Sequence, residues 1–106
     1  SFDYTIKEFD EVEGKLVKDA AYAATSSAEN LLVIAGGSFE DKPYIIVSIS
    51  KGLVEKLDLD AGKIVRQLAS HIDGGGGGQK FLAMAGGKNK KGLQEALLNA
   101  DEIIRI

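Results

Sequence analysis

Cysteine is absent from this chain of 106 residues, which excludes disulfide bonds and thiolate metal sites. Histidine occurs once, at His71, and no carboxylates cluster near it in the sequence to complete a zinc centre. No apolar run approaches the roughly 20 residues of a membrane-spanning helix, and the first residues do not resemble a signal peptide. We therefore expect a soluble, cytoplasmic protein with no metal site and no membrane partner.

The rest of the composition is that of a folded domain. Apolar residues make up 44% of the chain and charged residues 27%, both ordinary values for globular proteins. A chain of this length is large enough for one domain with a single modest core. Because the sequence begins directly at a strand-like segment, we expect residues 1–106 to be a single domain and a fragment of a longer chain.

Negative charge is in slight excess overall, but the positive charge is concentrated in one part of the chain. The net charge of −3 argues by itself against nucleic acid as a partner. Residues 62–92, however, hold six cations and one anion, a net +5, whereas the other residues hold seven cations and fifteen anions, a net −8. The six cations are Lys63, Arg66, Lys80, Lys88, Lys90 and Lys91. The simpler interpretation is a solvated helix end followed by a lysine-rich turn.

The hydrophobic pattern predicts strands and helices in mixed order. Apolar runs typical of strands occupy residues 4–9, 31–35, 44–49 and 81–85. Helical spacing covers residues 13–27, then 61–72 behind Asp60 as N-cap, and a last helix that Asn89 can begin. Residues 103–104 extend that helix or form a final short strand. This order predicts a single α/β (α+β) domain with a mixed β-sheet of about four to five strands covered by three helices.

Five consecutive glycines lie between the second predicted helix and the strand after it: Gly74, Gly75, Gly76, Gly77 and Gly78. Glycine loses more backbone freedom on ordering than any other residue, so an ordered run of five needs a use. The usual use is a loop whose unshielded N–H groups approach a phosphate or another anion. A flexible linker is the alternative, and the well-patterned segments on both sides disfavour it.

Two common phosphate-binding signatures are missing. A dinucleotide fingerprint needs a third glycine where Gln79 or Lys80 stands, and it follows a strand rather than a helix. A P-loop ending at Lys88 would need glycine in place of Leu82 and serine or threonine in place of Asn89. The glycine run therefore belongs to neither class.

Catalytic chemistry has little support, and we predict no catalytic residue. Ser70 is adjacent to His71, but neighbours along a helix point in different directions and do not form a nucleophile–base pair. His71 is better interpreted as a structural or RNA-facing residue at a helix end. The aromatic residues fit mostly a core by their pattern. An exposed one could stack on a base, but the sequence does not say which are exposed.

What remains is a surface suited to a polyanion. The glycine amides, Lys80 just after them, and three lysines beyond a second glycine pair can contact one strand of phosphates. Asn89 would also place the positive end of the last helix near these lysines. The residues that we expect to contact this polyanion are Gly74, Gly75, Gly76, Gly77, Gly78, Gln79, Lys80, Gly86, Gly87, Lys88, Lys90 and Lys91.

The spacing of these features is specific. The glycine run is followed by a short stretch, by Ala83-Met84-Ala85-Gly86-Gly87 and by the helix from Asn89. This arrangement resembles the C-terminal (C-Ala) domain of alanyl-tRNA synthetase, whose hallmark is a multi-glycine loop, Met/Ala-x-Ala-Gly-Gly and a helix. The same domain type follows the catalytic part of DHH-family phosphoesterases. The motif covers about a quarter of the chain, and the weaker pattern of elements covers nearly all of it.

The resemblance implies a non-catalytic domain that contacts the outer corner of tRNA (tRNA-Ala) and aids aminoacylation and editing. It implies no cofactor in this domain, and ATP, Mg²⁺ and Zn²⁺ in a parent alanine–tRNA ligase. Other domains of the parent are implied partners. In many members a helical segment before this domain also supports a homodimer, and this chain contains no such long helix.

Two departures from the family pattern bear on the site. The synthetases usually place Arg-Pro after the glycines and often a basic residue within them, whereas here Gln79-Lys80 follows and Gly75 takes the basic position. Lys80 is the nearest substitute for the arginine. The phosphoesterase branch places histidine directly after the glycines, so Gln79 disfavours it.

Two other hypotheses stay open at this point. The chain can be the accessory domain of a DHH-type phosphoesterase, where the glycines grip a phosphate of a nucleotide or of single-stranded nucleic acid. It can also be a purely structural or dimerisation module, where the glycines only allow tight packing.

Overall fold

The structure, a computed structural model, describes residues 2–105 and arranges them around one five-stranded sheet. The strands are β1 (Asp3–Asp10), β2 (Leu31–Phe39), β3 (Lys42–Ile49), β4 (Gly75–Gly78) and β5 (Leu82–Gly86). The α-helices are α1 (Gly14–Ser26), α2 (Lys51–Leu57), α3 (Ala61–Ala69) and α4 (Leu93–Ile104). Two 3₁₀ turns, η1 (Ser70–Ile72) and η2 (Lys90–Gly92), precede β4 and α4.

The sheet is mixed, with the strand order β1-β2-β3-β5-β4. β1 and β2 are parallel, and α1 provides the crossover that a parallel pair requires. The pairs β2–β3, β3–β5 and β5–β4 are antiparallel. β1 and β4 are consequently the two edge strands, and β4 is the edge made of glycine.

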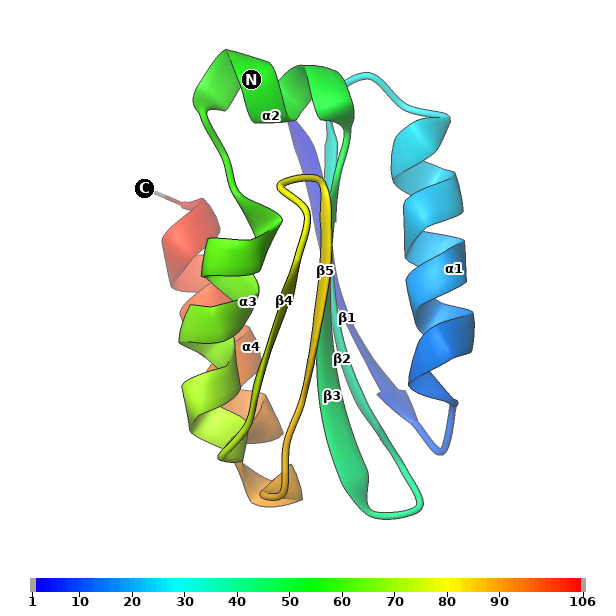
Figure 1. The fold of residues 1–106 in the computed structure, drawn as a ribbon, viewed down its shortest axis with the longest axis vertical. Coiled ribbons are helices and arrows are strands. Elements are labelled where there is room, and N and C mark those ends of the chain that lie inside the picture. Colours follow the sequence, from blue (N-terminus) through cyan, green and yellow to red (C-terminus); the bar gives the residue numbers. More distant parts are fainter. Residues whose placement is uncertain (1, 106) are drawn as a thin grey trace.

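The molecule has three layers (Figure 1). α1 covers one face of the sheet, α3 and α4 cover the other, and α2 lies across one end. Strands covered on both faces are apolar throughout, and this explains the continuous apolar runs of β2 and β3. Ile34, Ile45 and Ile46 are fully buried, and burying a side chain of that size contributes about 1.5–3 kcal/mol.

Tyr44 of β3 anchors the start of α1. Its hydroxyl donates a hydrogen bond of 2.7 Å to the carbonyl oxygen of Val12, and burial raises the pKa of Tyr44 above its ordinary value. Gly14 lies directly over the ring, because a Cβ there would come within 3.2 Å of it. No helix among residues 2–105 is long and apolar enough to cross a membrane.

The fold class expected from the sequence is confirmed, with three differences in detail. β2 was expected to end at residue 35, but it continues through Gly36 and Gly37 to Phe39. The β2–β3 hairpin turns at Glu40 and Asp41, whose φ angles are 51° and 64°. Positive φ at both turn residues is what a tight two-residue hairpin needs. α2 was not expected as a helix, and the glycine run is a strand rather than a loop.

Candidate nucleic-acid interface

The glycine run forms an edge strand. Gly75, Gly76, Gly77 and Gly78 pair in register with Gly86, Ala85, Met84 and Ala83 of β5. The expected loop is therefore wrong for these four residues. Their exposure agrees with the expectation, because Gly77 is half-buried and the other three are exposed.

Packing requires glycine at alternate positions of the run. A Cβ added at Gly74, Gly76 or Gly78 would collide with a carbonyl oxygen of β5. Gly78 also has a φ of 156°, which side-chain-bearing residues rarely adopt. A Cβ at Gly75 would meet nothing within 4 Å, and one at Gly77 would meet only the guanidinium of Arg66, at 3.1 Å. Tight packing thus explains three of the five glycines and leaves Gly75 unexplained.

The backbone amides of the run divide into two groups. Gly74 donates to the carbonyl of Ala69 at 3.0 Å, and Gln79 and Leu82 exchange hydrogen bonds of 2.8 and 3.4 Å at the hairpin turn. Because hydrogen-bonded pairs alternate along an antiparallel ladder, this exchange implies that Gly77 and Gly75 also bond to β5. The amides of Gly76 and Gly78 then point outward. The expected cradle of five free amides is reduced to two.

α3 packs beside β4 and holds the turn after it. Asp60 caps α3 as expected, accepting a hydrogen bond of 3.2 Å from the amide of Lys63. The backbone amide of Ala61, the first residue of α3, donates to the carbonyl oxygen of Lys80 at 2.8 Å. The first turn of α3 therefore fixes the backbone of the residue that follows the glycine strand.

Arg66 is a site residue that sequence reasoning missed. Its guanidinium lies close to the Cβ positions of both Gly77 and Gly62, so the exposed side chain lies over the glycine strand. In the sequence, Arg66 stood out only as one of the six cations of residues 62–92. The position of Arg66 beside β4 could not be predicted, because the glycine run was not predicted to be a strand.

The four site lysines do not form one cluster. Lys80 lies in the turn of the β4–β5 hairpin, whereas Lys88, Lys90 and Lys91 follow the far end of β5. β5 has five residues, so the two groups are roughly 17 Å apart along the strand. Lys90 also approaches Asp41, with Nζ and Oδ1 3.7 Å apart. The four lysines therefore flank the glycine strand at its two ends, whereas Arg66 lies over it.

The second glycine pair, Gly86 and Gly87, has a structural role in at least one of its two residues. Gly86 is exposed, but a Cβ at Gly87 would collide with the carbonyl oxygen of Ile72. The same oxygen accepts hydrogen bonds of 2.9 Å from the amides of Lys88 and Asn89. The role of Gly87 in close packing against η1 is thus established, whereas RNA binding by this residue stays a prediction.

Asn89 caps η2 rather than beginning the last helix directly. Its side chain accepts a hydrogen bond of 3.2 Å from the amide of Lys91. α4 starts at Leu93, four residues later than Asn89. The positive end of α4 is therefore farther from Lys88 than the sequence suggested.

The family model described as "DHHA1 domain" matches residues 2–105, almost the whole chain. The chain belongs to the DHHA1 domain family. The comparison with solved structures agrees: the C-Ala domain of Aquifex aeolicus alanyl-tRNA synthetase superposes with a TM-score of 0.83 at 27% identity, over 94% of this chain and 88% of that one. The resemblance found in the sequence is confirmed.

Relatives of this DHHA1 domain include alanine–tRNA ligases. That of Christiangramia forsetii is 45% identical over 84% of this chain and 10% of its own length. That of Porphyromonas gingivalis is 42% identical over 81% of this chain and 10% of its own length. The chain spans about a tenth of the length of these relatives. Together with Gln79, they favour the synthetase branch over the phosphoesterase branch.

His71 of the DHHA1 domain contacts α4 through its side chain. Its Nε2 lies 3.2 Å from Oδ1 of Asn99 in α4, and a Cβ at Gly92 would collide with its backbone carbonyl. These contacts agree with a structural role at the end of α3. Within residues 2–105, no three His, Cys, Asp or Glu side chains are grouped so that they could hold a metal ion.

Proposed function

We propose that this DHHA1 domain binds tRNA as the C-terminal domain of an alanine–tRNA ligase. The observation that carries the proposal is the exposed edge strand of glycines with two outward amides, flanked by lysines at both ends. Backbone N–H groups and lysines are the usual donors to phosphate and sugar oxygens. A bare strand lets a sugar–phosphate chain approach those donors without a side chain between them.

The family resemblance supports a proposal for the role in the parent enzyme. We propose that the domain contacts the outer corner of tRNA-Ala and helps one tRNA to serve both aminoacylation and editing. The chemistry, with ATP, Mg²⁺ and Zn²⁺, then belongs to other domains of a cytoplasmic ligase, which are this domain's partners. A homodimer of that ligase would be held by segments other than residues 1–106.

The affinity of the isolated domain for RNA is expected to be modest. The chain is acidic overall, and it offers a handful of cations along the glycine strand. Non-specific nucleic-acid binding of this electrostatic kind has dissociation constants of about 10⁻⁴–10⁻⁶ M at physiological salt. The binding should therefore fall steeply as salt is added.

A salt titration of tRNA binding tests the proposal. The triple variant Lys80→Ala, Lys88→Ala, Lys91→Ala should bind tRNA more weakly than the wild type. It should also flatten the plot of log affinity against log salt by about two to three units, because each lost phosphate contact removes roughly 0.7–0.9. Filter binding or fluorescence anisotropy measures both quantities.

The matched control removes three lysines on the other side of the molecule, by Lys7→Ala, Lys15→Ala and Lys18→Ala on β1 and α1. It changes the net charge equally and should leave the slope close to that of the wild type. Equal losses in the two triple variants, or none in either, would reject a tRNA-binding role for the glycine strand.

A further inference from the structure

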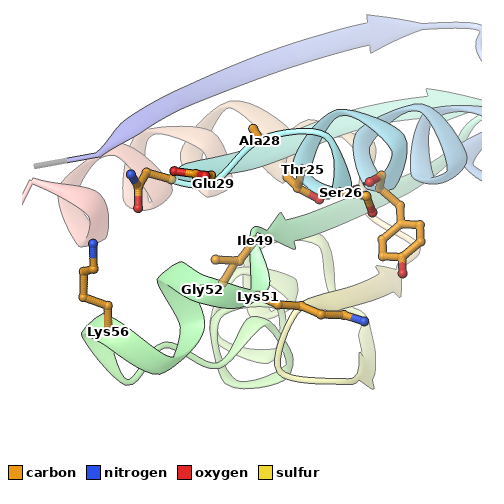
Figure 2. A pocket seen from close by; sticks show the side chains of 10 residues that line it. Thr25, Ser26, Ala28, Glu29, Ile49, Lys51, Gly52 and Lys56 are labelled. Atoms are coloured by element: carbon orange, nitrogen blue, oxygen red, sulfur yellow. Dashed lines mark hydrogen bonds between the residues drawn. The ribbon is translucent and has the colours of Figure 1, made fainter.

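A hollow of about 580 Å³ with a mixed polar and apolar lining lies between the end of α1 and the start of α2. Figure 2 shows Lys51 and Lys56 projecting from α2 at opposite ends of this hollow, with Glu29 on the facing wall. Tyr22 and Asn30 also line it. We call it the Tyr22–Lys51 hollow.

The wall behind this hollow is built from satisfied polar groups. The hydroxyls of Thr25 and Ser48 are hydrogen-bonded to each other at 2.7 Å, and that of Ser50 donates to the carbonyl of Thr25 at 2.9 Å. All three residues are buried. These bonds join α1 to β3 and give the hollow a defined shape without a ligand.

Lys51 connects this hollow to the hairpin turn that follows the glycine strand. A second hollow, of about 530 Å³, also includes Lys51 and is lined by Gln79, Lys80 and Phe81 of the hairpin turn. A strand of RNA that follows β4 to its end at Gly78 thus reaches this turn first and Lys51 next. The two surfaces can serve one ligand.

An exposed aromatic ring borders the hollow. Tyr22 is 37% exposed, and its ring centroid lies 6.1 Å from that of Phe81. The ammonium of Lys51 lies 4.6 Å from the Phe81 ring centroid. Partly exposed aromatic rings beside a cation are a combination with which proteins stack single-stranded bases and hold the adjoining phosphate.

We propose that the Tyr22–Lys51 hollow binds one unpaired nucleotide of the RNA, with its base stacked on Tyr22 and its phosphate against Lys51. Asn30 and Glu29 offer hydrogen bonds to the edge of the base. A base inside a double helix is already stacked on its neighbours, so the ligand is a loop or a single strand. This inference rests on the proposed function, because it places the hollow at the end of the same RNA path.

Two RNA probes distinguish binding in the hollow from binding through phosphate contacts alone. One is a hairpin with a seven-nucleotide loop, and the other is a blunt-ended duplex with the sequence of the hairpin's stem and no unpaired nucleotide. Tyr22→Ala should weaken binding to the hairpin about tenfold, since stacking on an aromatic ring contributes this much or more per base. Binding to the duplex should stay unchanged. The salt slope should also stay unchanged, because no phosphate contact is lost.

Conservative and matched variants complete the experiment. Tyr22→Phe keeps the ring and should bind the hairpin like the wild type. Tyr4→Ala removes a tyrosine of 38% exposure on β1 and should have no effect on binding. Tyr22 lies on the outside of α1, and alanine favours helix, so the variant should fold, as its circular dichroism will show.

The outcomes for the hollow and for the glycine strand are distinct. If Tyr22→Ala binds the hairpin as tightly as the wild type while the triple lysine variant loses affinity, the hollow is not a nucleotide site and the proposed function stands. If Tyr22→Ala weakens hairpin and duplex equally, the nucleotide site is also rejected. If the wild type binds neither probe, both proposals fail.

Discussion

At the scale of single residues, the glycine run contains two kinds of position. Gly74, Gly76 and Gly78 approach the backbone of β5 so closely that no side chain fits, whereas Gly75 faces open space. The hypothesis that glycine serves only packing therefore holds for alternate residues and not for the whole run. Gly75 is also the position where the family often places a basic residue, and the open space there can accommodate one.

A pair of alanine variants tests this alternation. Gly76→Ala should lower the free energy of unfolding by about 1–3 kcal/mol, because the new methyl group is forced against the β5 backbone. Gly75→Ala should change it by no more than about 0.5 kcal/mol, as is usual at open surface positions. Urea unfolding followed by circular dichroism measures both. Similar losses in the two variants would contradict the register of β4 with β5.

At the scale of elements, β4 depends on its neighbours rather than on its own residues. Glycine has little preference for strands, and β4 forms because β5 pairs with it on one side while α3 packs beside it. The outward amides of Gly76 and Gly78 are the part of this element that a ligand can use. The inward amides of Gly75 and Gly77 are engaged by the ladder.

Amide exchange distinguishes the two sets directly. In NMR spectra of the free domain, the amides of Gly76 and Gly78 should exchange with solvent faster than those of Gly75 and Gly77, because only the latter are hydrogen-bonded to β5. Adding tRNA should shift the resonances of the fast pair most. Protection of Gly76 and Gly78 in the free protein would contradict the assignment of outward amides.

Much of the fold was predictable because most elements carry local signals. The N-cap at Asp60 with the apolar stripe behind it predicted α3, and the apolar runs predicted the central strands. α2 was missed because Gly52 interrupts a segment of only seven residues. β4 was missed because glycine has little preference for strands, so that its stability comes from pairing with β5 and packing against α3 and not from its own residues.

The candidate site was predictable in its residues but not in its arrangement. Lys80 and Lys88 are close in sequence, yet the β4–β5 hairpin places them at opposite ends of β5. The exposure of Tyr22 could not be inferred either, because the sequence pattern assigned the aromatic residues mostly to the core. Both facts depend on how elements pack, which local sequence does not encode.

At the scale of the whole molecule, an acidic protein presents a basic path along one edge. The segment of residues 62–92 carries a net +5, and the remainder carries −8. Asp58 is an acidic residue beside this path, since it lines two hollows together with Lys80. Its charge should oppose an approaching phosphate chain.

Neutralising Asp58 should therefore strengthen RNA binding. Asp58→Asn should raise the affinity for tRNA about two- to fivefold, as expected for removing one exposed like-charge repulsion of up to about 1 kcal/mol. Asparagine also tolerates the left-handed backbone at this position, where φ is 53°. Asp10→Asn on β1, which changes the charge equally, should have little effect in the same anisotropy assay. Equal gains in the two variants would point to net charge alone.

The glycine strand also has a consequence for selectivity. A strand without side chains that contacts only phosphate and sugar has no means to tell adenine from guanine, or one anticodon from another. Along β4, discrimination can come only from the spacing of phosphates on a folded RNA. If the proposed function is right, transfer RNAs of different amino-acid identity should therefore compete for this edge almost equally, and selection among them would need contacts outside this domain.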